Sequence, residues 1–234
     1  MIFPGDIQVL TFDCYGTLID WETGILGALR PTLRGHNLQV NDHDILETYA
    51  SAEAAIEQDA YRRYREVLRS VVRQFGERFG FHPTEDEMTS LAESLRDWPP
   101  FTDAEPALRK LQKKYQLAAI SNVDDDLFAA SNHRLGIDFD HIITAQQANA
   151  YKPSEAVFEF AFRSIGIPRE RILHCAQSLY HDIAPASKLG MRTVWINRRH
   201  RARGFGATPP SEARPDFEVP DLLSLVELLE AESS

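Results

Sequence analysis

Short apolar segments alternate with amphipathic segments through most of the sequence, and this alternation limits the folds that the chain can adopt. The apolar segments lie at 7–12, 117–121, 141–144, 172–176, 192–197 and 217–219. Helical patterns between and after them lie at 104–114, 126–135, 154–165, 183–189 and 221–231. Strands that are apolar throughout and alternate with helices form a parallel sheet with both faces covered. The sequence therefore predicts an α/β fold built on a parallel sheet.

The long segment between the first and second predicted strands breaks this alternation, because it contains helical patterns and no strand pattern. Asp44–Gln58 and Glu85–Arg96 predict helices, the second with Thr84 as its N-cap. Between them, apolar residues recur at helical spacing, at Val67, Leu68, Val71, Val72, Phe75 and Phe79. A small bundle of helices is the structure that these patterns favour.

The sequence also indicates where this helical block begins and ends. Pro99 and Pro100 stop a helix and stiffen the connection back to the alternating segments. We therefore expect a helical domain at 20–98, inserted into a catalytic core made of 1–19 and 99–234.

The charge and the cysteine content narrow the classes of partner. The 234 residues include 25 Lys and Arg against 35 Asp and Glu, a formal net charge of −10. An acidic surface argues against nucleic-acid and anionic-membrane binding. No segment is long or apolar enough to span a bilayer, the N-terminal residues lack a signal pattern, and Cys14 and Cys175 do not make a disulfide framework. We expect a cytoplasmic protein with no nucleic-acid or membrane partner.

Polar side chains follow several of the predicted strands directly. They are Asp13, Ser121, Asn122, Gln177, Ser178 and Asp182, with Lys152 a few residues after the third strand. Ligands of open parallel sheets bind outside the carboxyl ends of the strands, so we expect these groups to share one edge. The helical block leaves the chain at the same edge, directly after Asp13, and is positioned to act as a lid.

Asp13 is the candidate nucleophile at this edge. A carboxylate can form an ester or acyl phosphate that splits one difficult step into two. Gly16 permits a tight loop after the strand, and the Thr17 hydroxyl is available to orient the acid. Taken alone, an Asp in this position more often forms a turn. Asp182 alone is likewise explained as the N-cap of the next helix, and Lys152 as a surface lysine.

Four motifs taken together resemble those of the haloacid dehalogenase superfamily. They are FDCYGTLID at 12–20, SN at 121–122, YKP at 151–153 and HCAQSLYHD at 174–182, in the family's order. The resemblance covers residues 7–20 and 100–198. It implies a Rossmann-like core with a helical cap inserted after the first motif, and catalytic roles for Asp13, Lys152 and Asp182.

Two positions distinguish branches of that superfamily. Its phosphatases carry a second Asp two residues after the nucleophile, where this chain has Tyr15. That second acid protonates a departing alkoxide, whereas a halide is a weak base that leaves without a proton. Its magnesium-dependent members carry a further Asp where this chain has Gln177. The sequence therefore resembles the type II L-2-haloacid dehalogenase branch.

That resemblance implies hydrolysis of short 2-haloacids to 2-hydroxy acids through an ester on Asp13, without a cofactor or a metal. The residues implied to bind the small anionic substrate are Cys14, Tyr15, Thr17, Ser121, Asn122, Gln177 and Ser178. Lys152 would neutralise both the substrate carboxylate and Asp13, and Asp182 would position Lys152. A homodimer is compatible with the family analogy.

Other positions depart from the branch. Characterised haloacid dehalogenases carry an arginine on the first long cap helix, but this chain has none between Arg34 and Arg62. Glu47, Glu53 and Glu57 occur there instead, and we interpret them as a solvated helix face. A tyrosine expected after the lysine motif is Phe158, and an asparagine expected before Asp182 is Leu179.

Two alternative functions remain open at this point. One is a magnesium-dependent phosphatase of the same superfamily, with Asp13, Tyr15 and Asp182 at the metal. The other is a catalytically weak binding protein that keeps the fold. The arginine-rich segment at 198–204 has the composition of an exposed, solvated loop, with a basic rim that steers anionic substrates as a secondary hypothesis.

Overall fold

The computed structural model describes residues 7–202 and 204–231, and within them one sheet of six parallel strands forms the centre of an α/β fold. The strand order is β3-β2-β1-β4-β5-β6. The strands are β1 (Val9–Phe12), β2 (Gln116–Ser121), β3 (His141–Thr144), β4 (Ile172–Ala176), β5 (Arg192–Ile196) and β6 (Phe217–Val219). The predicted α/β class and parallel sheet are confirmed.

Most helices lie at or near the predicted positions, whereas those at Trp21–Gly35 and Ala145–Ala148 were not predicted. Those between strands and at the C-terminal end are α5 (Ala104–Leu111), α6 (Asp125–Leu135), α7 (Ala145–Ala148), α8 (Glu155–Ile165), α9 (Ala184–Lys188) and α10 (Leu222–Ala231). Short 3-10 turns cover Leu95–Asp97 and Arg169–Arg171, and a π-helical turn covers Leu179–Ile183. None of the helices described in residues 7–202 and 204–231 is long and apolar enough to cross a membrane.

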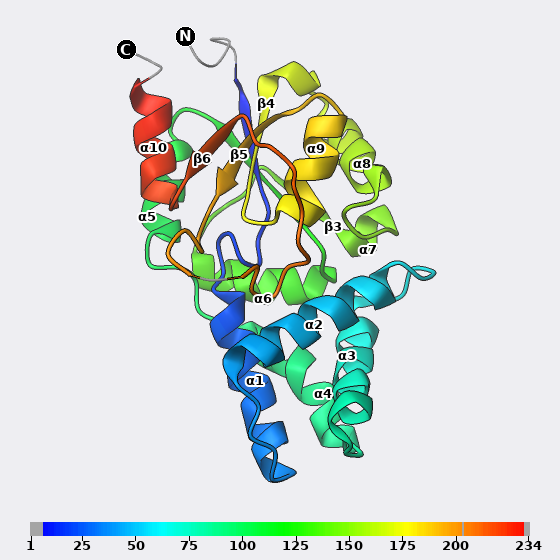
Figure 1. Cartoon of the computed structure of the whole chain (residues 1–234). Coiled ribbons are helices and arrows are strands. Elements are labelled where there is room, and N and C mark those ends of the chain that lie inside the picture. Colours follow the sequence, from blue (N-terminus) through cyan, green and yellow to red (C-terminus); the bar gives the residue numbers. More distant parts are fainter. Residues whose placement is uncertain (1–6, 203, 232–234) are drawn as a thin grey trace.

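Alternate residues of the central strands point to opposite faces of the sheet, where they belong to two separate apolar clusters. In β1, Leu10 and Phe12 join the cluster under α5, α6 and α10, whereas Val9 joins the cluster under α8 and α9. Every residue of β1 and β4 is buried, as expected for strands covered on both faces. Figure 1 shows α5 and α10 on one side of the sheet and α8 and α9 on the other.

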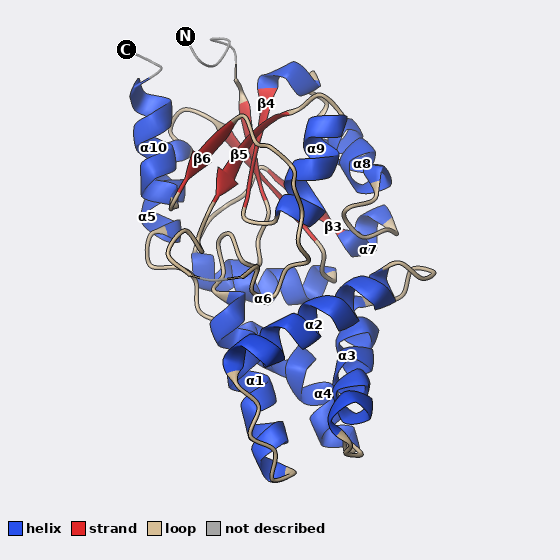
Figure 2. Ribbon diagram, viewed as in Figure 1, coloured by secondary structure: helices blue, strands red, loops and turns tan. Residues whose placement is uncertain are grey.

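The segment after β1 forms an all-helical unit at the end of the sheet where Asp13 lies (Figure 2). It contains α1 (Trp21–Gly35), α2 (Asp42–Glu57), α3 (Tyr64–Phe79) and α4 (Glu85–Ser94). The apolar stripe predicted from the sequence is the buried face of α3, which packs on α2 and α4. Thr84 caps α4, and Glu87 completes a capping box.

Backbone contacts join the two connecting segments through which the chain enters and leaves this helical unit. The Asp20 N–H donates to the Pro99 carbonyl at 2.8 Å, and Ile19 forms a β-bridge with Pro100. These contacts lie where the sequence places the boundary between 1–19 plus 99–234 and 20–98. The domain division itself stays a prediction.

Proline is common in the first turn of a helix, but Pro153 lies before the helix that follows it. Lys152 and Pro153 form a turn, and α8 begins at Glu155 with Ser154 as its N-cap. From this turn the Lys152 side chain reaches Asp13 and Asp182.

Candidate active site

Five of the seven groups predicted at the sheet edge meet around a small cavity of about 30 Å³, which Ser121 and Gln177 do not line. On the side of the sheet it is lined by Asp13, Tyr15, Asn122, Lys152, Ser178, His181 and Asp182. On the side of the helical unit it is lined by Trp21, Glu53, Glu57 and Tyr64. We call Asp13, Lys152 and Asp182 the core wall, and Glu53, Glu57 and Tyr64 the cap wall.

Lys152 joins the two acids of the core wall. Its Nζ donates to Asp13 Oδ1 at 2.8 Å, to Asp182 Oδ1 at 2.7 Å and to the Ile120 carbonyl at 2.8 Å. Its side chain is 1% exposed. Burial alone would lower the pKa of Lys152, but the charges of Asp13 and Asp182 raise it above its usual value. Lys152 is therefore a permanent cation.

The loop after β1 holds Asp13 from its other side. The Thr17 hydroxyl donates to Asp13 Oδ2 at 2.7 Å and accepts from the Gln177 N–H at 2.9 Å. Gly16 has a φ of +92°, a conformation that other residues avoid, so the loop can turn back this tightly. Burial raises the pKa of Asp13, while Lys152 and Thr17 oppose that rise.

Asp182 lies within the π-helical turn and does not cap a helix, so that structural explanation is wrong. The N-cap of α9 is Ile183, and no side chain caps it. Asp182 Oδ1 accepts from Lys152 and lies 3.1 Å from His174 Nε2, while its Oδ2 is buried without a partner. Burial alone would raise the pKa of Asp182, but Lys152 and His174 hold it below its usual value. Asp182 is therefore an anion with one oxygen available.

Asn122 fixes the turn that carries Lys152. Its Oδ1 accepts from the Lys152 N–H at 2.8 Å, and its Nδ2 donates to the Lys152 carbonyl at 3.0 Å and to Glu57 Oε2 at 3.2 Å. Ser121 is buried beside it, and its hydroxyl has no hydrogen-bond partner in the structure. Asn122 therefore positions Lys152 and Glu57.

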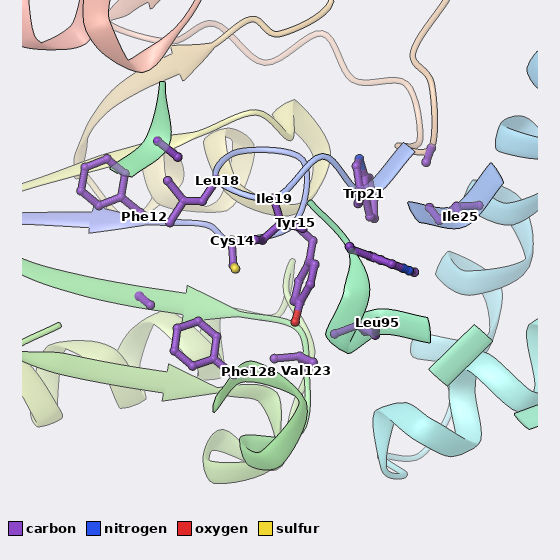
Figure 3. Close-up of a cluster of buried hydrophobic side chains, with 14 of the residues drawn as sticks. Phe12, Cys14, Tyr15, Leu18, Ile19, Trp21, Ile25, Leu95, Val123 and Phe128 are labelled. Carbon is purple, nitrogen blue, oxygen red and sulfur yellow. The ribbon is translucent and has the colours of Figure 1, made fainter. Parts of the chain in front are cut away.

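Tyr15 and Cys14 extend away from the nucleophile. The Tyr15 hydroxyl lies 2.8 Å from the Ser131 hydroxyl, and its ring packs edge-on against Trp98. Figure 3 shows the Tyr15 ring running toward Val123 with its oxygen at the far end, among apolar side chains that include Cys14. Burial raises the pKa values of Tyr15 and Cys14 well above their usual ranges. Neither group is arranged to exchange a proton with substrate.

The two predicted residues after β4 point in different directions. Gln177 accepts from Thr208 through its side-chain oxygen at 3.3 Å, and it does not line the cavity. Ser178 lines the cavity, where its Oγ accepts from the His181 N–H at 2.9 Å and lies 3.2 Å from His181 Nδ1. Burial lowers the pKa of His181 to about 4, so its imidazole is neutral at physiological pH.

The interpretation of the cap-helix acids as a solvated face is wrong for Glu53 and Glu57. Their side chains are 3% and 4% exposed, whereas Glu47 is exposed. Glu53 Oε1 accepts from the Tyr49 hydroxyl at 2.7 Å and from the Tyr64 hydroxyl at 2.5 Å. Because α2 packs against the sheet edge through this face, tertiary contact buries what a solvated helix would expose.

Burial changes the protonation of both acids. It raises the pKa of Glu53 to about 7, although the Tyr64 and Tyr49 hydrogen bonds oppose the rise. Burial, aided by the charge of Glu53, raises the pKa of Glu57 well above its usual value. One sequence signal was available for this face: Tyr49, Glu53 and Glu57 follow one another at four-residue spacing, so they share one stripe of α2. His181 and Tyr64 had no such signal.

Asp124 places Tyr64 in the cap wall. Asp124 occupies the N-cap position of α6 but makes no side-chain cap bond there. Its carboxylate accepts instead from the backbone N–H groups of Tyr64 and Arg65 at 3.1 and 3.2 Å. A carboxylate there satisfies N–H groups that the first turn of α3 leaves without partners. The loop after β2 therefore holds the helical unit.

No arginine replaces the one absent from the cap helix among the residues that line the cavity. Arg62 bonds to Asp59, and the Arg63 guanidinium donates to Gln146 Oε1 at 2.6 Å. Glu57, Lys152 and His181 also line a more open pocket of about 410 Å³ between the helical unit and the core. These three side chains therefore separate that pocket from the cavity.

The arginine-rich segment is not a solvated turn at its first two residues, which corrects the sequence interpretation. Arg198 donates to the Thr17 carbonyl at 2.8 Å and to Asp103 at 2.8 and 2.9 Å, and Arg199 pairs with Glu22. Arg198 therefore holds the loop that orients Asp13. Arg201 is exposed, and Arg203 lies outside the described residues.

The residues around Asp13 do not fit a magnesium ion. Lys152 and Thr17 already donate to the two Asp13 oxygens, and Lys152 lies between Asp13 and Asp182. Gln177 supplies an amide in place of an acid and points to Thr208. Within 7–202 and 204–231, no three or more His, Cys, Asp or Glu side chains are arranged to hold a metal.

Comparisons with known proteins identify the family of this chain. A sequence model of the haloacid dehalogenase-like hydrolases matches residues 7–190. Haloacetate dehalogenase H-2 of Moraxella sp. (strain B) is 28% identical over 228 residues, covering 95% of this chain and 98% of that protein. (S)-2-haloacid dehalogenase of Pseudomonas sp. (strain YL) is 25% identical over 228 residues, covering 96% and 95%. The solved structure of L-2-haloacid dehalogenase from Xanthobacter autotrophicus matches with a TM-score of 0.79 at 20% identity, covering 96% and 98%.

Proposed function

Since the chain belongs to the haloacid dehalogenase-like hydrolases, we propose that it hydrolyses the carbon–halogen bond of short 2-haloacids with Asp13 as the nucleophile. One observation carries the proposal. Asp13 is held by Lys152 and Thr17, and the side chain two residues later, Tyr15, turns its hydroxyl to Ser131. The site thus lacks the acid at that position that an alkoxide leaving group requires, which favours a halide.

The first step is a displacement at carbon. A carboxylate oxygen of Asp13 bonds to C2 of the haloacid, and the electron pair of the carbon–halogen bond leaves with the halide. Lys152 neutralises the Asp13 carboxylate before the reaction and the substrate carboxylate in the complex. Such a step gives inversion at C2.

The second step is hydrolysis of the ester. Water adds to the carbonyl carbon of the Asp13 ester, and its proton passes to the Asp182 carboxylate, whose Oδ2 is buried without a partner. The bond between that carbonyl carbon and the substrate oxygen then breaks, and the 2-hydroxy acid leaves with the proton. The second proton of the water is released to solvent, and Asp13 is regenerated as a carboxylate with one oxygen from water.

The substrate class and the setting are also part of the proposal. Relatives named as dehalogenases of haloacetate and of (S)-2-haloacids support a small anionic substrate, and the net charge of −10 argues against nucleic acid. We propose a cytoplasmic setting, which two free buried cysteines, Cys14 and Cys175, support. No cofactor enters either step.

The test measures halide release from chloro-, bromo- and fluoro-substituted acetate and propionate. We expect release by the native enzyme and a loss of at least about 10³-fold in Asp13→Asn, since the nucleophile is removed. Asp138→Asn, at an exposed position, is the matched control. Turnover in ¹⁸O-labelled water should place the label in the peptide that contains Asp13.

A second panel of phosphate esters, with and without magnesium, separates the alternatives. Phosphate release that requires magnesium, with no halide from any haloacid, would identify a phosphatase. No product in either panel would favour a binding protein that keeps the fold. Label in the hydroxy acid but never in Asp13 would show that water attacks the substrate directly.

A further inference from the structure

The cap wall contains two buried acids and no cation, at the position where the dehalogenase branch is expected to carry an arginine. Glu53 and Glu57 both line the 30 Å³ cavity together with Asp13. Of the described side chains that line it, Lys152 is the one permanent cation, and it is already paired with two carboxylates. Glu53 and Glu57 therefore have no positive charge of their own.

The charge balance of the cavity limits how these acids can be ionised. Asp13 and Asp182 together exceed the charge of Lys152 by one. Ionised Glu53 and Glu57 would add two more negative charges at a place where the proposed reaction admits one anion and releases another. In a site that excludes water, such repulsion is far stronger than in solution. Neutral carboxyl groups remove it.

Three buried polar atoms of cavity-lining residues lack a hydrogen-bond partner: Asp182 Oδ2 on the core wall, and one atom each of Glu57 and His181. Glu57 Oε1 has none, although Glu57 Oε2 accepts from Asn122 at 3.2 Å. His181 Nε2 has none either, and it lies 4.0 Å from Glu57 Oε2. The two side chains are 4% and 8% exposed. Buried polar atoms are nearly always paired, so this pair of orphans points to a ligand.

The hydrogen bonds of Glu53 leave a place for a proton. Both tyrosine hydroxyls, Tyr49 and Tyr64, donate to the same oxygen, Oε1. A carboxylic acid with one doubly accepting oxygen carries its proton on the other, here Oε2. The tyrosines therefore fix the orientation of a neutral acid without neutralising a charge.

We propose that Glu53 and Glu57 act as neutral carboxylic acids that donate hydrogen bonds to the departing halide. The proposal rests on the dehalogenase function above. The electron pair of the broken bond leaves with the halide, and the carboxyl proton is shared with it while staying on the carboxyl oxygen. No further reactant is required. The pair of acids thus supplies the electrophilic contact that a cap arginine would otherwise supply.

The groups that face the pair are consistent with neutrality. They are Asp13, Asp124, Tyr151, Lys152, Tyr180, His181 and Asp182 from the core, and Tyr49, Asp59, Tyr61 and Tyr64 from the helical unit. Asp13 raises the pKa of Glu53, and Lys152 lowers that of Glu57. His181 is neutral, since burial lowers its pKa to about 4. The pKa of Glu53, about 7, predicts that ionisation ends its role above neutral pH.

The decisive experiment compares pH profiles. For 2-chloropropionate, kcat/KM of the native enzyme should fall about tenfold per pH unit once Glu53 ionises above pH 7. Glu53→Gln keeps an N–H donor that does not titrate, so it should lose less activity at pH 9 than the native enzyme does. Glu57→Gln retains Glu53 and should therefore keep the native inflection near pH 7. Glu47→Gln, on the same helix but exposed, should follow the native profile.

A second variant, Tyr64→Phe, leaves every charged group in place and tests whether the pH profile reports on the ionisation of Glu53. The Tyr64 hydrogen bond lowers the pKa of Glu53, so Tyr64→Phe should move the inflection of the profile to higher pH. A purely structural role for Glu53 would not shift the inflection.

Bromide binding tests the pair without turnover. Trp21 lines the cavity, so quenching of its fluorescence reports on an anion there. The Kd for bromide should rise with pH in the native protein and stay constant in Glu53→Gln. If no haloacid releases halide but bromide binds in this way, the dehalogenase function fails while the donor role at an anion site stands.

Two results would overturn the proposal. One is a native profile that is flat from pH 6 to 9, with the Gln variants reduced equally at every pH. The other is faster turnover of 2-chloropropionamide than of 2-chloropropionate, reversed in Glu57→Gln, because an amide donates to ionised acids. Either result, obtained with halide release intact, would leave the dehalogenase function standing.

Discussion

The core wall and the cap wall both contain buried acids, but the two walls compensate for the lost hydration of those acids in opposite ways. On the core wall, Asp13 and Asp182 share Lys152, whose Nζ lies 2.8 and 2.7 Å from them. On the cap wall, Glu53 meets two tyrosine hydroxyls and no cation. A buried carboxyl group remains ionised where a nearby cation offsets the free energy of lost hydration. Without such a cation it stays protonated. One cavity thus contains a charged side and a neutral side.

Removal of Lys152 should break the core wall and give the largest effect. Lys152→Met leaves Asp13 and Asp182 buried without a cation, so it should destabilise the fold by about 3–5 kcal/mol and abolish turnover. Urea unfolding and initial rates measure both. Lys188→Met is the matched control, because Lys188 is 74% exposed and its pair with Glu155 is worth at most about 1 kcal/mol. Equal loss in the two variants would contradict the comparison.

The buried acid Glu53 of the cap wall should make the free energy of unfolding depend on pH. Burial raises the folded-state pKa of Glu53 from 4.5 to about 7, so its contribution is full below pH 4.5 and is lost as pH rises to 7. The change is on the order of 3 kcal/mol. His181 changes stability in the opposite direction, since burial lowers its pKa to about 4. The free energy of unfolding of the native protein minus that of Glu53→Gln, at pH 5 to 8, isolates Glu53.

This difference should shrink from pH 5 to 7 and then stay constant. Glu77→Gln, at an exposed position of α3, is the matched control. A constant difference for Glu53→Gln would mean that Glu53 is ionised in the folded protein throughout.

Arg198 tests the core wall from outside the cavity, because it bonds to the Thr17 carbonyl and Thr17 in turn bonds to Asp13. Arg198→Met removes bonds to the Thr17 carbonyl and to Asp103, and should cost about 2 kcal/mol. Because Thr17 orients Asp13, kcat should fall more than KM rises. Arg201→Met, at an exposed position of the same segment, should leave kcat unchanged. A change in KM alone would favour the basic-rim hypothesis.

Tyr15→Phe should have the smallest effect. The Tyr15 hydroxyl contacts Ser131 and not the cavity acids, so its loss should cost about 1 kcal/mol of stability. We expect kcat/KM to stay within about twofold of the native value. Loss of activity at unchanged stability would show that this hydroxyl takes part in the reaction.

The core wall could be predicted from the sequence because each member follows a strand or its connection. The carboxyl ends of parallel strands meet at one edge, so Asp13, Lys152 and Asp182 had to converge once the sheet was inferred. Their catalytic roles stay predictions. The interpretation of Asp182 as a helix cap failed, because a π-helical turn draws its carboxylate to Lys152.

The cap wall could not be predicted in the same way. An acid on an amphipathic helix is usually solvated, and only the packing of α2 against the sheet edge buries Glu53 and Glu57. The prediction of an exposed loop from the composition of 198–204 failed at Arg198 for a similar reason. Its partner Asp103 lies 95 positions away in the sequence, at the start of α5, and no local pattern links the two.

The sequence alone determined the parallel sheet, the helical insertion and the edge where the nucleophile lies, because strand and helix periodicity and strand-end position are local properties of the chain. Only the tertiary structure decided the charge of each buried acid. A carboxyl group's protonation depends on its burial and on which cation or hydroxyl reaches it, and in this protein those partners come from distant segments. The acid two residues after Asp13 is absent from the sequence, but the two acids that replace a cap arginine appear only when α2 closes on the core.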